Sequence, residues 1–210
     1  MSMTPPYASI RCLLAGKTAL IFDFDGTIAE TTPLHARAFE ETLAPLGVAA
    51  DYPSIAGLKT QEAIVRCLRT EGRCEADFDL PALVAEKQRR ARKLIAEQLE
   101  RIPAVEAFLV RARSRFRMAL VTCGSRGTVT LALRKLGYEG WFDPIVCAED
   151  VAHAKPAPDG ILEALAAMQV RPEQTLVFED TAFGFEAARA AGLAIVDVNS
   201  LNWSNAVANI

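Results

Sequence analysis

The feature that most constrains the fold is a regular alternation of short apolar runs and helix-like segments after Pro103. Each apolar run has the length and composition of a buried strand, and the segments between the runs have apolar residues at helical spacing. Strands are predicted at 118–123, 145–147, 175–178 and 194–198. One predicted helix ends at 136, and two others cover 161–168 and 183–191. A further apolar run lies near the N-terminus, at 18–22. This order predicts an α/β core: a Rossmann-like, doubly wound parallel sheet with helices on both faces.

The segment between the first predicted strand and Pro103 contains only helix-like stretches. Apolar residues at helical spacing predict helices at 33–46, 61–71 and 81–101. We therefore predict two domains: a core formed by 1–32 and 103–210, and a small all-helical domain, 33–102, inserted into it.

Composition narrows the class of protein. The chain has 210 residues, 51% of them hydrophobic, and a net charge of -3. This is the composition of a soluble globular protein, and the nearly balanced charge gives no reason to expect nucleic acid or a membrane as partner. The five cysteines are scattered and form no CxxC pair, which predicts free thiols in a reducing cytoplasm. A monomer is the default expectation.

The longest predicted helix carries a group of basic residues: Lys87, Arg89, Arg90, Arg92 and Lys93. Such a group could form an anion-binding surface. Because Glu86 and Glu97 are interleaved with it, the sequence favours a solvated helix face.

The strongest candidate for chemistry is Asp23-Phe24-Asp25-Gly26-Thr27, directly after the first predicted strand. Residues two apart on an extended chain point the same way, so Asp23 and Asp25 can serve one site. Two close carboxylates push one pKa upward, which allows one to act as an ionised nucleophile and the other as a proton carrier. The alternative, a calcium loop, would need further ligands at a different spacing.

Three weaker candidates also follow predicted strands. Thr122, Gly124 and Ser125 offer hydroxyl and backbone donors suited to phosphate, although such residues are often only helix caps. Lys155 stands in a proline-rich loop and could supply a localised positive charge or lie at the surface. Glu179 and Asp180 suit a hard cation, or else cap the next helix. Because the carboxyl ends of parallel strands share one edge, these groups together predict a site for phosphoryl transfer.

The motifs, in this order, resemble the signature of the haloacid dehalogenase superfamily over residues 18–198. The helical insert, 155–159 and 177–192 are similar to the β-phosphoglucomutase-like branch, nearest to sugar-phosphate phosphatases of the fructose-1-phosphatase-like type. The resemblance implies that the inserted domain is a cap. It also implies a Mg²⁺-dependent phosphoric monoester hydrolase that acts on a small phosphorylated metabolite through an aspartyl-phosphate intermediate.

By this resemblance, Asp23 is the nucleophile and Asp25 the general acid and base. Thr122 and Lys155 bind the transferring phosphoryl group. The implied magnesium ligands are Asp23, the backbone carbonyl of Asp25, and Asp180, with Glu179 supporting them.

The resemblance and the position of the cap add substrate-binding candidates: Gly124, Ser125, His35 and Lys59. His35 either bonds to Asp25 or the substrate, or is exposed at the start of a helix. Cys123 and Gly124 stand where the branch commonly has serine or asparagine, and Glu30 stands where it has aspartate. These departures leave the substrate open, and Cys123 could make the protein sensitive to oxidation.

Three other functions remain open. A sugar phosphomutase would share all the motifs, but it must hold a second phosphate, and Lys59 is the cap cation that could do so. A halide-releasing dehalogenase needs no metal site, which argues against it here. A catalytically silent phosphometabolite-binding module would be expected to have lost the nucleophile or a metal ligand, and the chain retains both.

Overall fold

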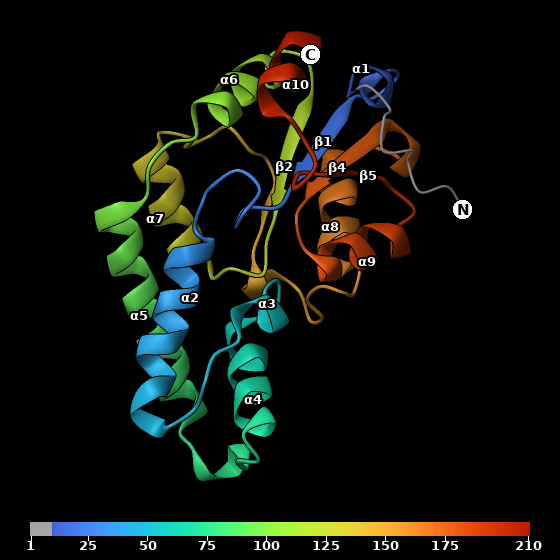
Figure 1. Ribbon diagram of the computed structural model, residues 1–210. Helices are drawn as coiled ribbons and strands as arrows, with labels where there is room; N and C mark the ends of the chain where they lie inside the picture. Colours follow the sequence, from blue (N-terminus) through green and yellow to red (C-terminus); the bar gives the residue numbers. More distant parts are fainter. Residues whose placement is uncertain (1–9) are drawn as a thin grey trace.

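The computed structural model describes residues 10–210, whose centre is a five-stranded parallel sheet with the order β3-β2-β1-β4-β5 (Figure 1). The strands are β1 Ala19–Phe22, β2 Arg117–Val121, β3 Ile145–Val146, β4 Thr175–Glu179 and β5 Ala194–Asp197. Ile21 of β1 is in register with Ala119 of β2 and Val177 of β4. The predicted doubly wound parallel sheet is therefore confirmed, with the first motif at the end of its central strand.

The structure has the predicted helices and also others, at 10–14, 52–55, 103–112 and 203–209, that the sequence pattern did not predict. They are α1 Ile10–Leu14, α2 Thr32–Leu43, α3 Tyr52–Ile55, α4 Thr60–Thr70, α5 Leu80–Gln98, α6 Pro103–Ala112, α7 Arg126–Leu136, α8 Asp159–Met168, α9 Ala182–Ala190 and α10 Trp203–Asn209. Short 3₁₀ turns cover Ala44–Leu46, Glu75–Asp77, Ala148–Asp150 and Pro172–Gln174. None of the helices within 10–210 is both long and apolar enough to span a membrane.

Both faces of the sheet are buried, which explains why β1 is apolar at every position. Leu20 and Phe22 face a core shared with α6, α7 and α10, whereas Ala19 and Ile21 face a core shared with α8 and α9. Figure 1 shows these two helix layers on opposite sides of the strands. A strand covered on both faces reads as a continuous apolar run, and this is the signal that the sequence carries.

Helices α2 to α5 lie beyond the carboxyl ends of the strands (Figure 1). They have an apolar cluster of their own, which includes Phe39, Leu43, Ile64 and Leu68. In contrast, Ala91 of α5 belongs to the larger core cluster, so the long helix joins the two parts. The boundaries of the inserted domain at 33 and 102 stay a prediction.

The sequence pattern predicted no element after residue 198, yet α10 packs into the core. Trp203 stacks on Phe178 with ring centroids 5.9 Å apart and meets Phe108 edge-on at 5.2 Å. A local signal was available, because the Asn202 side chain caps the helix by accepting from the Asn205 amide at 2.9 Å. The helix is short, and its stability depends on this packing.

We predict that Phe108→Ala lowers the free energy of unfolding by about 3–5 kcal/mol, because Phe108 is fully buried between Phe22, Phe178 and Trp203. Chemical denaturation monitored by circular dichroism measures this. The matched control is Val110→Ala on the same helix; Val110 is half exposed, so a change within about 0.5 kcal/mol is expected. Equal losses for the two variants would contradict the described core.

Candidate active site

Side chains from three neighbouring strands meet beside a cavity of about 270 Å³. Asp23 follows β1, Thr122 follows β2, and Glu179 and Asp180 stand at the end of β4. Because the strands are parallel and adjacent, their carboxyl ends bring these residues together, as the sequence predicted. Further residues that line the cavity include Asp25, Gly124 and Ser125 from the core and His35, Phe39, Tyr52, Lys87 and Gln88 from the helical segment.

Lys155 is buried between two carboxylates. Its Nζ donates to Asp23 Oδ1 at 2.5 Å and to Glu179 Oε2 at 2.6 Å, and all three side chains are less than a tenth exposed. Burial alone would lower the pKa of Lys155, but the two carboxylates outweigh it and raise that pKa above its usual value. Lys155 is therefore a permanent cation beside Asp23, and the alternative of a surface lysine is wrong.

Asp23, Glu179 and Asp180 form an acidic cluster whose nearest oxygens all lie within 4.8 Å of one another. Burial and Glu179 raise the pKa of Asp23 well above its usual value, and the same two causes raise that of Asp180 to about 7. Carboxylates held this close favour a cation between them. The donors are all oxygen atoms, which fits Mg²⁺.

Within this cluster Glu179 is already engaged. Its Oε1 accepts from the Thr181 hydroxyl at 2.8 Å and from the Thr181 amide at 3.0 Å, while its Oε2 accepts from Lys155. Asp180 has fewer partners, because its Oδ1 accepts only from the Thr27 hydroxyl, at 3.1 Å. Asp23 and Asp180 are thus freer to ligate a cation, and Glu179 orders the residues around them.

The turn after Asp23 depends on Gly26. Its φ of +84° is strained for residues with a side chain, and a Cβ at this position would collide with Asp180 Oδ2. The glycine therefore allows the first motif to approach the acidic residues of β4.

The electrostatic surroundings of Asp25 are opposite to those of Asp23. Its Oδ1 accepts from the Thr31 hydroxyl at 2.5 Å and lies 3.1 Å from His35 Nε2. Burial opposes ionisation, but His35, Thr31 and Lys87 outweigh it and lower the pKa of Asp25 to about 2. The expectation that one of the two aspartates has a raised pKa holds, but the raised one is Asp23, because burial and the neighbouring carboxylates outweigh Lys155 there.

His35 is buried against Asp25, so its exposed alternative is wrong. Its Nδ1 lies 2.9 Å from Lys87 Nζ. Burial and Lys87 lower the pKa of His35, although Asp25 opposes them. A neutral His35 donates from Nε2 to Asp25 and accepts at Nδ1 from Lys87, which links the three side chains in one line.

The burial of Lys87 shows that the prediction of a solvated basic helix face is wrong for this residue. It is only 5% exposed and lies over the Phe39 ring, 4.2 Å from the centroid. Burial lowers its pKa to about 8. The signal for this was its spacing, because 87, 91, 94 and 95 share one face of the helix and the last three are apolar. Its neighbours Arg89 and Arg90 pair with Glu86 at the surface, as expected.

The loop after β2 presents donors to the cavity. The Thr122 hydroxyl lies 3.5 Å from Asp25 Oδ2 and accepts from the Gly124 amide at 2.9 Å. Ser125 bonds to Thr128 at 2.9 Å, at the start of α7. Hydroxyls and amides at a helix N-terminus suit an anion such as phosphate.

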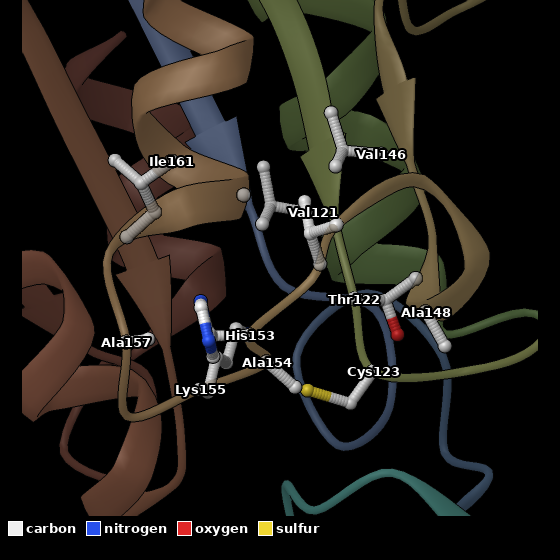
Figure 2. Close-up of a pocket in the computed structure, with 12 residues that line it drawn as sticks. Val121, Thr122, Cys123, Val146, Ala148, His153, Ala154, Lys155, Ala157 and Ile161 are labelled. Carbon is white, nitrogen blue, oxygen red and sulfur yellow. The ribbon is translucent and has the colours of Figure 1, made fainter.

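Cys123 lines the same cavity, beside the loop that carries Ala154 and Lys155 (Figure 2). Burial raises its pKa to about 11, so it stays a thiol at neutral pH. This argues against the sensitivity to oxidation that the sequence suggested, because the reactive form is the thiolate. Behind it, Val121, Val146 and Ile161 surround a cavity of about 10 Å³, which has room for no more than one water molecule.

Two residues that the sequence associated with the substrate, Lys59 and Glu30, lie outside the cavity lining. Lys59 Nζ donates to the carbonyls of Val151 at 2.8 Å and Ala152 at 3.4 Å, and Lys59 does not line the cavity. The loop before Lys155 offers it backbone oxygens, and its contact with substrate stays a prediction. Glu30 is exposed and also stands outside the cavity lining.

Comparison with known proteins gives consistent matches over most of the chain. The sequence model for haloacid dehalogenase-like hydrolases matches residues 20–198. Fructose-1-phosphate phosphatase YqaB of Escherichia coli is 38% identical, over 87% of this chain and 96% of that protein. The crystal structure of CbbY from Rhodobacter sphaeroides with xylulose-(1,5)bisphosphate has a TM-score of 0.77 and 33% identity, covering 85% of this chain and 84% of that one. A β-phosphoglucomutase from Clostridium difficile shares the fold, with a TM-score of 0.80 and 22% identity over 90% and 92% of the two chains.

We predict that Thr31→Val raises the pKa of the Asp25 carboxyl by about one unit, because it removes a hydrogen bond that stabilises the charged form. Carbon-13 NMR titration of the aspartate carboxyl groups measures this. Thr42→Val is the matched control: Thr42 is buried on α2, the helix that begins directly after Thr31, and donates to the Ala38 carbonyl instead. An unchanged Asp25 pKa in Thr31→Val would show that the bond has no such effect.

Proposed function

Because the chain belongs to the haloacid dehalogenase-like hydrolase family, we propose that it is a Mg²⁺-dependent phosphatase of a small sugar phosphate that reacts through Asp23. One observation carries the proposal: Lys155 holds Asp23 at 2.5 Å, at the end of the central strand and beside an acidic cluster. A carboxylate fixed in this way can attack a phosphoryl group whose charge is neutralised by its neighbours. The activity named for the Escherichia coli relative supports a sugar phosphate as the substrate class.

In the first half-reaction, an Asp23 carboxylate oxygen attacks phosphorus. A bond forms between Asp23 and phosphorus, the bond from phosphorus to the substrate alkoxide oxygen breaks, and Asp25 supplies the proton that the leaving oxygen takes up. In the second half-reaction, water attacks phosphorus, Asp25 receives the proton from that water, and the Asp23–phosphorus bond breaks. The products are a free alcohol and inorganic phosphate.

Asp25 is suited to the second half-reaction as it stands, because its pKa near 2 leaves it ionised and able to accept a proton. The first half-reaction requires it to be protonated. A phosphoryl dianion close to Asp25 raises its pKa, and the Thr122 contact places this carboxylate next to the proposed phosphoryl site. Thr31 and His35 position Asp25 during both steps.

The phosphoryl oxygens are bound by Thr122, Lys155 and the amides near Gly124 and Ser125. Mg²⁺ would be held by Asp23, Asp180 and the Asp25 carbonyl, and when bound it supplies positive charge to the phosphoryl oxygens. Lys155 already neutralises part of the charge on Asp23. The helical segment 33–102 acts as a cap that limits access of water to the cavity. Monomeric state and cytoplasmic location stay predictions.

Hydrolysis is preferred to the alternatives on specific contacts. A phosphomutase needs a cation for the second phosphate, and Lys59 bonds to core carbonyls instead. The acidic residues at the end of β4 have no task in a dehalogenase, whereas they suit a metal-dependent reaction. The nucleophile, its cation and the metal ligands lie together, which argues against a silent binding module.

We predict that Asp23→Asn lowers the hydrolysis of para-nitrophenyl phosphate in Mg²⁺ by at least about 1,000-fold, because an amide cannot form the acyl phosphate. Asp77→Asn makes the same chemical change at an exposed position and should retain full activity. EDTA should remove wild-type activity, and added Mg²⁺ should restore it. Acid-quenched wild-type enzyme should carry phosphate on Asp23 in peptide mass spectra; phosphate on another residue would refute the mechanism.

A separate prediction concerns the product. With a hexose 1-phosphate, inorganic phosphate should be released and the hexose 6-phosphate should not accumulate, because Lys87, the one cation of the helical segment 33–102 that lines the cavity, is engaged by His35. Phosphorus-31 NMR follows both species in one sample. Isomer formation that outpaces phosphate release would favour the phosphomutase.

A further inference from the structure

The walls of the cavity are mostly uncharged once the catalytic groups, His35 and Lys87 are set aside. Polar side chains come from Tyr52, Gln88, Ser125 and Thr128, and Phe39 and Leu58 add apolar surface. Tyr52 packs against Phe39 with ring centroids 6.1 Å apart. These hydroxyl and amide groups can exchange hydrogen bonds with substrate hydroxyls, while the apolar surface contacts a carbon skeleton.

Every cation near the cavity already has partners. Lys155 is paired with Asp23 and Glu179, and Lys87 is held by His35 and the Phe39 ring. Lys59, which comes from the cap loop, bonds to two carbonyls of the core. Within the part of the chain that the structure describes, no arginine lines the cavity.

These engaged cations limit which chemical group the substrate can carry at the end away from the transferred phosphoryl group. A second phosphate or a carboxylate would lose water in the cavity without gaining an unengaged cation, and an unpaired charge is costly to bury. A hydroxyl group would instead find neutral partners. Burial and the three nearby aspartates raise the pKa of Tyr52, so its hydroxyl stays a hydrogen-bond donor.

We propose that the substrate is a monophosphate whose remaining part is uncharged and carries several hydroxyl groups, and that bisphosphates and phosphorylated carboxylic acids are discriminated against. This inference rests on the proposed phosphatase function and names the substrate class of the same site. It separates this chain from the CbbY structure that holds a bisphosphate. The cavity volume of about 270 Å³ suits a small metabolite.

The test compares kcat/KM for a ketohexose 1-phosphate, the same ketohexose 1,6-bisphosphate, phosphoglycolate and para-nitrophenyl phosphate. The monophosphate of the sugar should exceed the bisphosphate and the phosphorylated acid by at least about tenfold. An equal or higher value for either of these two, with para-nitrophenyl phosphate hydrolysed, would overturn the inference and leave the phosphatase function intact. Absence of hydrolysis for all four would overturn the phosphatase function, and the inference with it.

Two sets of variants test whether the lack of an unengaged cation causes the discrimination against bisphosphates. Gln88→Lys and Gln88→Met both remove the amide, but only the first adds a cation. The ratio of bisphosphate to monophosphate kcat/KM should therefore be about tenfold higher in Gln88→Lys than in Gln88→Met. Lys59→Met should leave the wild-type ratio unchanged. A selective loss of bisphosphate hydrolysis in Lys59→Met would show that Lys59 reaches the second phosphate, which contradicts the proposal.

Discussion

The buried contact of Lys155 with Asp23 and Glu179 is the interaction on which the site depends. It joins the end of β1, the end of β4 and the loop before α8 at distances of 2.5 and 2.6 Å. Without the ammonium, two carboxylates would face each other away from water, an arrangement that is strongly unfavourable. The pair of bonds therefore does two things: it makes the acidic cluster compatible with a folded core, and it fixes the oxygen atoms of Asp23 in place.

From this centre the two aspartates of the first motif diverge. Asp23 is buried and faces other carboxylates, so its pKa is raised in spite of Lys155. Asp25 faces Thr31, His35 and Lys87, so it is ionised by the protein itself. Two residues that are only two positions apart thus receive different electrostatic surroundings. In the proposed mechanism the same division separates the nucleophile, which works with a metal, from the residue that transfers protons.

The helical segment carries two lysines that make different contacts: Lys87 lines the cavity and Lys59 does not. Lys87 comes from the long helix and extends the line of contacts behind Asp25, on the same helix face as the buried residues Ala91 and Leu94. Lys59 holds the cap loop to the core segment that leads to Lys155. Both lysines are therefore engaged by the protein, and the cavity surface other than Lys87 and the acidic groups is neutral, which connects the packing of the helical segment with the proposed selectivity.

The sequence by itself determined the parallel sheet, the position of each motif after a strand, and the set of residues that meet at the sheet edge. These are local consequences of apolar runs and of strand direction, so single segments carry them. Only the tertiary structure decided that Lys87 is buried, that Lys59 is turned away from the cavity, that α10 packs through Trp203, and which aspartate has the raised pKa. Each of these depends on partners far away in the chain, and the energy of burying or pairing a group belongs to the contact and not to either sequence segment.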